Sequence, residues 1–256
     1  MSPTNLEAIY RWGVLAELAI AALALPLLFW ITVPYGGRHT SQRWGPTLPA
    51  WIAWMGMELP AAAACVWAYA LGRFAGEPVS LLLLLGFVAH YVNRAILYPL
   101  RMRTSGKRTP VLSAGIALCV NCLNGTINGL AIGHVVHYGT AWLADPRFVL
   151  GAAILVLGAT VNLQADAILR GLRAPGEAGY RIPTGGLYRW VSSPNYLGEI
   201  VQWGGWALAT WSGAGLAFFA LTVANLAPRA RAHQRWYHAT FPDYPRQRRA
   251  LVPGVW

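Results

Sequence analysis

The sequence contains little charge. Only 11% of its 256 residues are charged and 56% are hydrophobic, whereas a soluble domain carries about 25% charged residues. No polar linker and no internal repeat divides the chain, and Lys107 is the sole lysine among twenty basic residues. The shortage of charge excludes an ordinary soluble protein, and the lack of an internal boundary predicts one membrane domain over residues 1–256.

Cysteine is also scarce, and no cleavable signal peptide is recognisable. Cys65, Cys119 and Cys122 all lie in apolar stretches, where cysteine is usually a small buried residue and not half of a disulfide. The N-terminal segment MSPTNLEAIYRW has neither a basic region nor a small-residue cleavage site, so we expect the first apolar stretch to be retained.

No nucleic-acid-binding motif accompanies the net charge of +11. We therefore expect no nucleic-acid partner, no metal and no obligate protein partner.

Long apolar stretches dominate what is present. A transmembrane helix takes about 20 mostly apolar residues, and seven stretches approach or exceed that length: 9–33, 50–71, 79–100, 111–136, 148–169, 196–211 and 215–232. The last two are short, and the tight turn between them predicts a helical hairpin. The pattern predicts an all-α polytopic membrane protein with seven transmembrane helices.

Basic residues are distributed unevenly around these stretches. Sixteen follow the odd-numbered stretches or lie in the C-terminal tail, three lie on the opposite side, and Arg94 lies inside the third stretch. Because cytoplasmic loops collect Lys and Arg, we predict an outside N-terminus and a cytoplasmic C-terminus. Nineteen of the twenty basic residues are arginine, which is typical of a GC-rich bacterial genome and indicates a bacterial inner membrane.

Polar side chains recur at helical spacing in four of the stretches and form polar stripes. The stripes are Asn121, Asn124 and Asn128; Asn162, Asp166, Arg170 and Arg173; Asn195, Glu199 and Gln202; and Arg229, His233 and Tyr237. Because lipid rejects such groups, we expect the stripes to face one another around a polar cavity open to the cytoplasm. Arginine binds phosphate in bidentate fashion and carboxylates accept hydrogen bonds from ribose hydroxyls, so the mixture suits a nucleotide. No GxGxxG fingerprint follows a strand, which excludes a Rossmann site.

Two other interpretations of the stripes stay open. Amides and Asp–Arg pairs also hold membrane helices together without any ligand. A proton-coupled transporter uses similar residues, although the sequence shows no inverted repeat of the kind that many transporters have.

A further polar group lies in the second and third stretches. Glu58 sits in the middle of an apolar stretch, and Tyr91, Arg94 and Tyr98 share one face of the next stretch by 3–4 spacing. Desolvation disfavours the charged form of a carboxyl group, so Glu58 is expected to stay protonated and, with Tyr91, to donate hydrogen bonds to a carbonyl oxygen. The alternative is a structural pair between Glu58 and Arg94. Glu17, also within a stretch, has no evident partner.

From Glu58 to the C-terminus the sequence resembles the steroid 5α-reductase family, the 3-oxo-5α-steroid 4-dehydrogenases. The resemblance rests on VNLQADAILRGLRAPGEAGYRIPTGGLYRWVSSPNYLGEI, RARAHQRWYHATFPDYP and RRALVPGVW. It implies a seven-helix fold with NADPH in a cytosol-facing cavity, held mainly by residues 111–256, and a steroid or sterol-like enone drawn from the bilayer by the first four helices. The implied reaction is hydride transfer to C5 of a Δ4-3-ketosteroid.

The resemblance also implies roles for individual residues. Glu58 and Tyr91 would bind the 3-keto oxygen of the steroid. The implied cofactor-binding residues are Asn124, Asn162, Asp166, Arg170, Arg173, Tyr180, Arg181, Asn195, Glu199, Arg229, His233 and Tyr237, with Arg103 and Lys107 as further phosphate contacts. SSPNYLGE also resembles a wider superfamily of sterol C14-type reductases and isoprenylcysteine methyltransferases, so a reductase of that type or a methyltransferase using S-adenosylmethionine is the alternative. S-adenosylmethionine has no phosphate for the arginines to bind.

Overall fold

The computed structural model describes residues 1–31, 33, 44–101, 107–172 and 179–256, and this part of the chain is mainly helical. Its α-helices are α1 (Pro3–Trp30), α2 (Ala50–Ala70), α3 (Pro78–Val92), α4 (Tyr98–Arg101), α5 (Val111–Leu130), α6 (Pro146–Gly171), α7 (Pro194–Thr210) and α8 (Gly213–Thr240). Two π-helical turns, Asn93–Leu97 and Ala131–Val135, join α3 to α4 and extend α5. The all-α prediction is confirmed, and each of the seven predicted stretches coincides with a helical segment.

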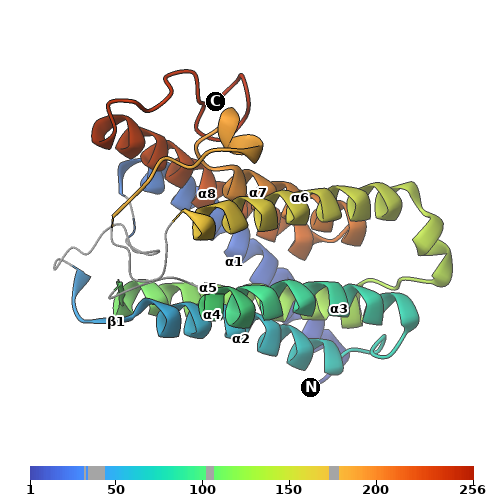
Figure 1. Ribbon diagram of the computed structural model, residues 1–256. Helices are drawn as coiled ribbons and strands as arrows, with labels where there is room; N and C mark the ends of the chain where they lie inside the picture. Colours follow the sequence, from blue (N-terminus) through green and yellow to red (C-terminus); the bar gives the residue numbers. More distant parts are fainter. Residues whose placement is uncertain (32, 34–43, 102–106, 173–178) are drawn as a thin grey trace.

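The helices form two layers (Figure 1). Helices α2 to α5 make one layer and α6 to α8 the other, while α1 runs diagonally between them and packs against α8 and α5. A short antiparallel pair of strands, β1 (Thr47–Pro49) and β2 (Arg108–Pro110), lies at one end of the α2–α5 layer. The sequence did not predict these strands, because three-residue strands carry no periodic pattern.

Glycines bring helices within each layer very close together. A Cβ atom at Gly158 of α6 would overlap the backbone nitrogen of Gln202, and one at Gly198 of α7 would overlap that of Asn162. A Cβ atom at Gly125 of α5 would likewise overlap the Ala61 carbonyl of α2. Small residues at such spacing are the usual basis of close helix packing in membranes. The contacts place the polar stripes of α6 and α7 directly against each other.

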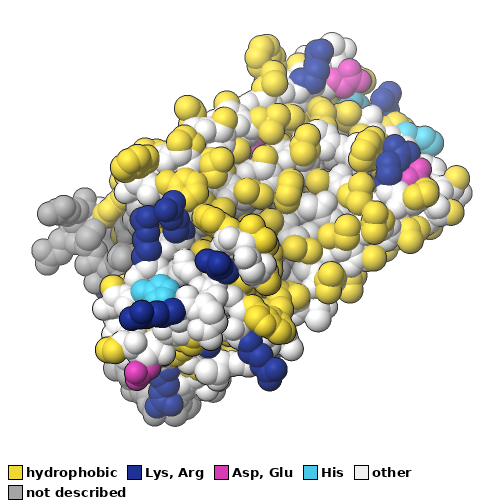
Figure 2. Space-filling model, turned by 90° about the horizontal axis from the view of Figure 1, so that it is seen from above, with side chains coloured by type: hydrophobic (Ala, Val, Ile, Leu, Met, Phe, Trp, Pro, Cys, Tyr) yellow, Lys and Arg dark blue, Asp and Glu magenta, His cyan; other side chains and the backbone are white. Residues whose placement is uncertain are grey.

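Among the residues that the structure describes, four helical segments are long and apolar enough to cross a membrane: Pro3–Trp30, Pro78–Arg101, Val111–Val135 and Pro146–Gly171. Figure 2 shows a band of hydrophobic side chains between two ends of the molecule that carry charged ones. Large apolar side chains are also exposed on α1, α3 and α5. The fold is that of an integral membrane protein, and the crossing by all seven helices and their orientation stay predictions.

Helix boundaries differ from the predicted ones mainly at α8. The stretch was expected to end at residue 232, but α8 continues to Thr240 because the polar segment RARAHQRWYHAT stays helical. The predicted hairpin turn between α7 and α8 is confirmed. It is made by Trp211, which has a left-handed backbone with φ of 45°, and by Ser212, whose hydroxyl accepts a hydrogen bond from the Gly215 backbone nitrogen.

Candidate active site

A cavity of about 620 Å³ is lined by α1, α2, α3 and α5 to α8. Its apolar wall comes mostly from α1 and α5, through residues such as Ile20, Ala24, Ile116 and Val120. Basic and other polar residues line it where α6 and α8 end, at the end of the bundle that carries β1 and β2. The cavity therefore suits a ligand with one apolar part and one anionic part.

Most residues predicted for the site lie around this one cavity. The lining includes Glu58, Tyr91, Lys107, Asp166, Arg170, Tyr180, Arg181, Asn195, Glu199, Arg229, His233 and Tyr237. Asn124 and Asn162 do not line it. They lie one layer behind, where Asn162 donates a hydrogen bond to the Asn195 carbonyl (2.9 Å). Arg103 and Arg173 lie outside the described residues.

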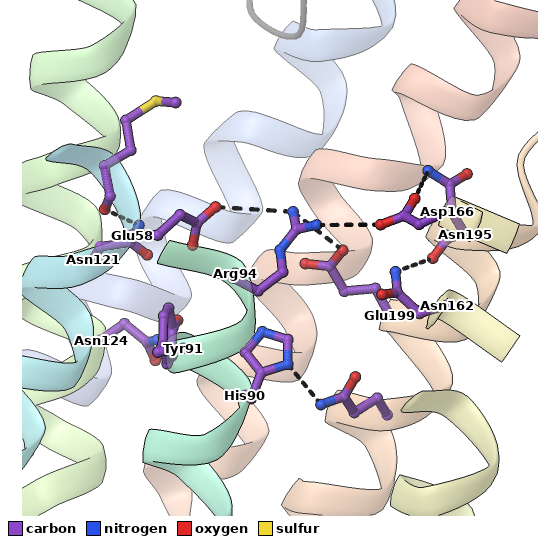
Figure 3. A network of polar contacts seen from close by, with 12 residues as sticks. Glu58, His90, Tyr91, Arg94, Asn121, Asn124, Asn162, Asp166, Asn195 and Glu199 are labelled. Carbon is purple, nitrogen blue, oxygen red and sulfur yellow. Dashed lines mark hydrogen bonds and ion pairs between the residues drawn. The ribbon is translucent and has the colours of Figure 1, made fainter. Parts of the chain in front are cut away.

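Arg94 stands at the centre of the polar cluster, where three carboxyl groups converge (Figure 3). Its Nη2 lies 3.9 Å from Glu58 Oε1 and 3.7 Å from Glu199 Oε2. Its Nη1 lies 3.8 Å from Asp166 Oδ2. The pair of Glu58 and Arg94 considered from the sequence therefore exists, but the guanidinium is shared between the two layers. A partial signal was present in the sequence, since Arg94 shares a helix face with Tyr91.

The local backbone and two aromatic rings hold Arg94 in this position. Arg94 lies in the π-helical turn Asn93–Leu97, and such turns change the direction in which side chains leave a helix. The guanidinium carbon lies 4.9 Å from the centre of the Trp54 ring and 5.1 Å from that of Tyr98. Cation–π attraction of this kind is stronger where water is excluded. Arg94 is 9% exposed, so the rings compensate part of its lost hydration.

The cluster contains more acidic groups than basic ones. If all three carboxyl groups were ionised, they would outnumber the single guanidinium among them by two charges. An uncompensated charge in a buried site is costly, so a neutral form of at least one carboxyl group is favoured. In its neutral form the carboxyl group of Glu58 can donate a hydrogen bond.

Tyr91 belongs to a buried chain of hydrogen bonds that begins at Asn124, which Figure 3 shows beside it. Asn124 Nδ2 donates to the Tyr91 hydroxyl at 3.1 Å. Asn128 Nδ2 donates to Asn124 Oδ1 at 2.8 Å, and Trp206 Nε1 donates to Asn128 Oδ1 at 2.8 Å. Asn124 and Asn128 are fully buried. Two of the three predicted α5 amides therefore form hydrogen bonds inside the protein and do not line the cavity.

Sequence reasoning missed His90 and Trp206. His90 lines the cavity, its Nδ1 lies 2.8 Å from Gln202 Nε2, and its ring packs on Trp203 with centroids 4.6 Å apart. A histidine one residue before Tyr91 carries no periodic signal of its own. A tryptophan such as Trp206 within an apolar stretch is indistinguishable, in the sequence, from an interfacial one.

The loop before α7 lines the basic end of the cavity, and the C-terminal segment packs against this loop. The Tyr244 hydroxyl donates to Ser192 Oγ (2.8 Å), and Arg248 Nη1 donates to the Pro183 carbonyl (2.9 Å). Burial raises the pKa of the Tyr244 phenol, which stays neutral at ordinary pH. These contacts hold the loop that carries Tyr180 and Arg181 beside the cavity.

Glu17 of α1 is a buried acid outside this cluster. Its side chain is 0% exposed, and neither carboxyl oxygen has a hydrogen-bond partner among the residues that the structure describes. A charged carboxylate without a partner is strongly disfavoured in such a position. Glu17 has no assigned role.

The fold and the cavity together define a helical membrane protein whose interior binding site is apolar on one side and basic on the other. Residues 107–256, more than half of the chain, match the family described as 3-oxo-5-alpha-steroid 4-dehydrogenase. The chain is 41% identical over 247 residues to the steroid 5-alpha-reductase DET2 of Gossypium hirsutum, covering 93% of this chain and 95% of that protein.

Two further relatives agree. The DET2 protein of Solanum lycopersicum is 41% identical over 253 residues, covering 98% of each chain. The 3-oxo-5-alpha-steroid 4-dehydrogenase 1 of Homo sapiens is 39% identical over 220 residues, covering 85% of this chain and 84% of that protein. The chain belongs to the steroid 5-alpha-reductase (3-oxo-5-alpha-steroid 4-dehydrogenase) family, as the resemblance in its sequence predicted.

Proposed function

We propose that the protein reduces the Δ4 double bond of 3-ketosteroids to 5α-3-ketosteroids, with NADPH as the hydride donor. Relatives of this chain are named for a dehydrogenase acting on 3-oxo-5-alpha-steroids, so they are oxidoreductases by name. The observation that carries the proposal is the placement of Glu58 and Tyr91 in one cavity with an apolar wall on one side and basic residues on the other.

The basic end of the cavity fits the phosphates of NADPH. Lys107, Arg170, Arg181 and Arg229 all line it, and Arg is the side chain best matched to phosphate geometry. Family membership favours a nicotinamide cofactor, and four basic side chains exceed what one pyrophosphate needs, which favours NADPH over NADH. S-adenosylmethionine, the cofactor of the methyltransferase alternative, offers these residues no phosphate to bind.

The mechanism follows from what the side chains can donate. Glu58 and Tyr91 donate hydrogen bonds to the C3 oxygen of the steroid and polarise the enone. When bound, NADPH supplies the hydride, which goes to C5. Negative charge then develops on the C3 oxygen as an enolate, and donors already aimed at that oxygen stabilise it. A proton added at C4 completes the reduction.

Binding of the steroid relies on the apolar wall. The wall formed by Ile20, Ala24, Ile116 and Val120 offers a dry surface to the rings, and exclusion of water strengthens the hydrogen bonds at C3. We propose that the substrate comes from the bilayer and that the protein resides in a bacterial inner membrane.

On the cofactor side of the cavity, Asp166, Asn195 and Glu199 would face the cofactor from α6 and α7.

One experiment tests the proposal. Purified protein in lipid nanodiscs is incubated with NADPH and progesterone, and the products are analysed by mass spectrometry and chromatography against 5α- and 5β-dihydro standards. The 5α product is expected from the parent, and Glu58→Ala serves as the matched control that should give almost none. Absence of any reduction by folded, NADPH-binding parent protein would refute the proposed function.

A further inference from the structure

The hydrogen-bond chain behind Tyr91 has a defined direction. Its origin is the indole N–H of Trp206, which can donate a hydrogen bond but cannot accept one. Trp206 Nε1 lies 2.8 Å from an Asn128 side-chain atom, and that atom must therefore be the amide oxygen. The orientation of the Asn128 side-chain amide therefore follows from its partner, because the indole N–H of Trp206 can only donate.

The direction passes from one amide to the next. With its oxygen on Trp206, Asn128 presents its NH₂ group to the Asn124 side chain, 2.8 Å away, which must accept through its own oxygen. Asn124 then presents its NH₂ group to the Tyr91 hydroxyl at 3.1 Å. The Tyr91 oxygen is thus an acceptor toward the protein. In the described part of the chain its own proton has no acceptor, and Tyr91 lines the cavity.

We propose that Trp206, Asn128 and Asn124 are positioning residues that aim the Tyr91 proton into the cavity and strengthen it as a donor. The inference rests on the proposed function, in which Tyr91 donates to the C3 oxygen of a steroid. None of the three touches the substrate. They act through Tyr91 alone, and they form a chain we call the Trp206 relay.

Two physical effects follow from the relay. A hydroxyl that already accepts a hydrogen bond is a stronger donor, because successive hydrogen bonds polarise one another in a low-dielectric interior. The fixed direction also spares the hydroxyl from reorienting when charge develops on the ligand, which is how preorganised donors lower a barrier. All four side chains are at most 2% exposed, so water cannot substitute for a missing member.

The first test is a double-mutant cycle between Asn124 and Tyr91. Asn124→Leu keeps the approximate size of the side chain but removes the donor to Tyr91. We expect kcat to fall about 10-fold, less than the roughly 10²- to 10³-fold loss for Tyr91→Phe, which removes the donor itself. In a Tyr91→Phe background, Asn124→Leu should cause no further fall in kcat. The KM for steroid should change only a few-fold in each variant.

Trp206→Phe provides a second, independent variant if Asn124→Leu folds poorly. Without the indole donor, only the hydrogen bond from Asn128 Nδ2 to the Asn124 backbone carbonyl (3.0 Å) still favours this direction. We therefore expect kcat to fall by about 3- to 10-fold, again only when Tyr91 is present. Trp142→Phe is the matched control. Trp142 also donates its indole N–H, to the Ala209 carbonyl at 3.0 Å, but it lies outside the relay. Its loss should leave kcat unchanged.

A vibrational measurement separates positioning from mere support of the fold. The C3 carbonyl of a ¹³C-labelled 3-oxo-Δ4 steroid is observed by infrared difference spectroscopy in the presence of NADP⁺, which binds without reducing it. In the parent, the carbonyl stretch should lie below its value in an apolar solvent, because hydrogen bonding weakens the C=O bond. It should move upward in Asn124→Leu, Trp206→Phe and Tyr91→Phe, and stay unchanged in Trp142→Phe.

The outcomes discriminate the two proposals. A parent that does not reduce the steroid, or a Tyr91→Phe variant at the parent rate, overturns the proposed function. A slow Tyr91→Phe variant beside an Asn124→Leu variant at the parent rate overturns the relay alone. So do rate losses that multiply in the double variant, and so does a carbonyl stretch that is the same in Asn124→Leu as in the parent. A carbonyl stretch in the parent that matches the value in apolar solvent overturns the proposed donor roles of Glu58 and Tyr91 as well.

Discussion

At the scale of single residues, the guanidinium of Arg94 lies close to three carboxyl groups. Arg94 contacts Glu58 on α2, Asp166 on α6 and Glu199 on α7, so it joins the layer that carries the proposed donors to the layer that carries most of the basic residues. Removing one partner of a buried ionic group leaves the others uncompensated, which costs far more than the pair itself contributes. Arg94 therefore ties together the two halves of the site.

The first prediction concerns the two proposed donors. Glu58→Ala and Tyr91→Phe should each lower kcat by about 10² to 10³, the usual cost of losing one preorganised donor at an oxyanion site. Glu58→Gln keeps a donor and should retain part of the activity. Because the two donors act as one unit, the double variant should be little worse than the worse single variant. Steady-state kinetics and NADPH titration measure these effects, with cofactor affinity expected to stay within a few-fold.

A purely structural role for Glu58 gives the opposite pattern. If Glu58 only neutralises Arg94, its variants should lose thermal stability and NADPH binding together, while Tyr91→Phe stays nearly fully active. A folded, NADPH-binding Glu58→Ala enzyme that works at the parent rate would also rule out the donor role.

The second prediction concerns the basic end of the cavity. Arg229→Ala should raise the KM for NADPH by about 30- to 1,000-fold, since a lost charged hydrogen bond costs about 2–4 kcal/mol. Arg173→Ala, outside the described residues, is expected to behave in the same way. Arg147→Ala is the control: Arg147 pairs with Asp145 at 2.8 Å, and neither residue lines the cavity. A parent enzyme that uses NADH as well as NADPH contradicts the assignment of these arginines.

At the scale of helices and strands, packing depends on glycine. The third prediction is that Gly158→Ala lowers the melting temperature, because its Cβ atom would meet the Gln202 backbone of α7 and overpacking costs about 1–3 kcal/mol. Gly86→Ala is the matched control on α3, where no neighbouring side chain or other helix of the described chain lies within 4 Å of the added Cβ. There alanine should leave the melting temperature unchanged or raise it, since alanine is the better helix former. Equal melting temperatures for both variants would argue against close α6–α7 packing.

Hydropathy predicted the helices well but not their irregularities. Segments of apolar residues predicted α2, the continuous segment from α3 to α4, and α5 with its π-helical turn nearly to the residue, because a helix within lipid must be mostly apolar. A π-helical turn depends on tertiary contacts, so the sequence around Arg94 did not predict one. The polar continuation of α8 was missed for a related reason: it is stabilised by packing on the C-terminal segment, as where Gln234 donates to the Arg248 carbonyl.

The candidate site was predictable where it follows helical periodicity. Asp166, Asn195, Glu199 and Arg229 were placed on facing stripes by spacing alone, and they line one cavity. The hydrogen bonds that join side chains of different helices were not predictable in this way. Spacing cannot tell that Asn128 turns toward Trp206 on α7, because that contact depends on how two helices rotate against each other.

At the scale of the whole molecule, charge sets the orientation. Lys107 lies beside β2 at one end of the bundle, and the α2–α3 connection with Arg73 lies at the other end. The fourth prediction is that, in a background lacking the native cysteines, Lys107→Cys resists a membrane-impermeant thiol reagent added outside cells, whereas Arg73→Cys reacts. A reporter fused after Trp256 should behave as internal. The reverse labelling pattern would refute the orientation.

The diagonal course of α1 has a consequence for the bilayer itself. At about 1.5 Å per residue, its 28 residues span about 42 Å, whereas the hydrocarbon core is about 30 Å thick. A helix that is too long for its membrane tilts, and its tilt changes with membrane thickness. Because α1 supplies one wall of the cavity, lipids with longer or shorter acyl chains should reshape the apolar side of the cavity, where the proposed steroid substrate would lie. Lipid chain length then acts as a modulator of turnover, with no effector molecule and no binding site of its own.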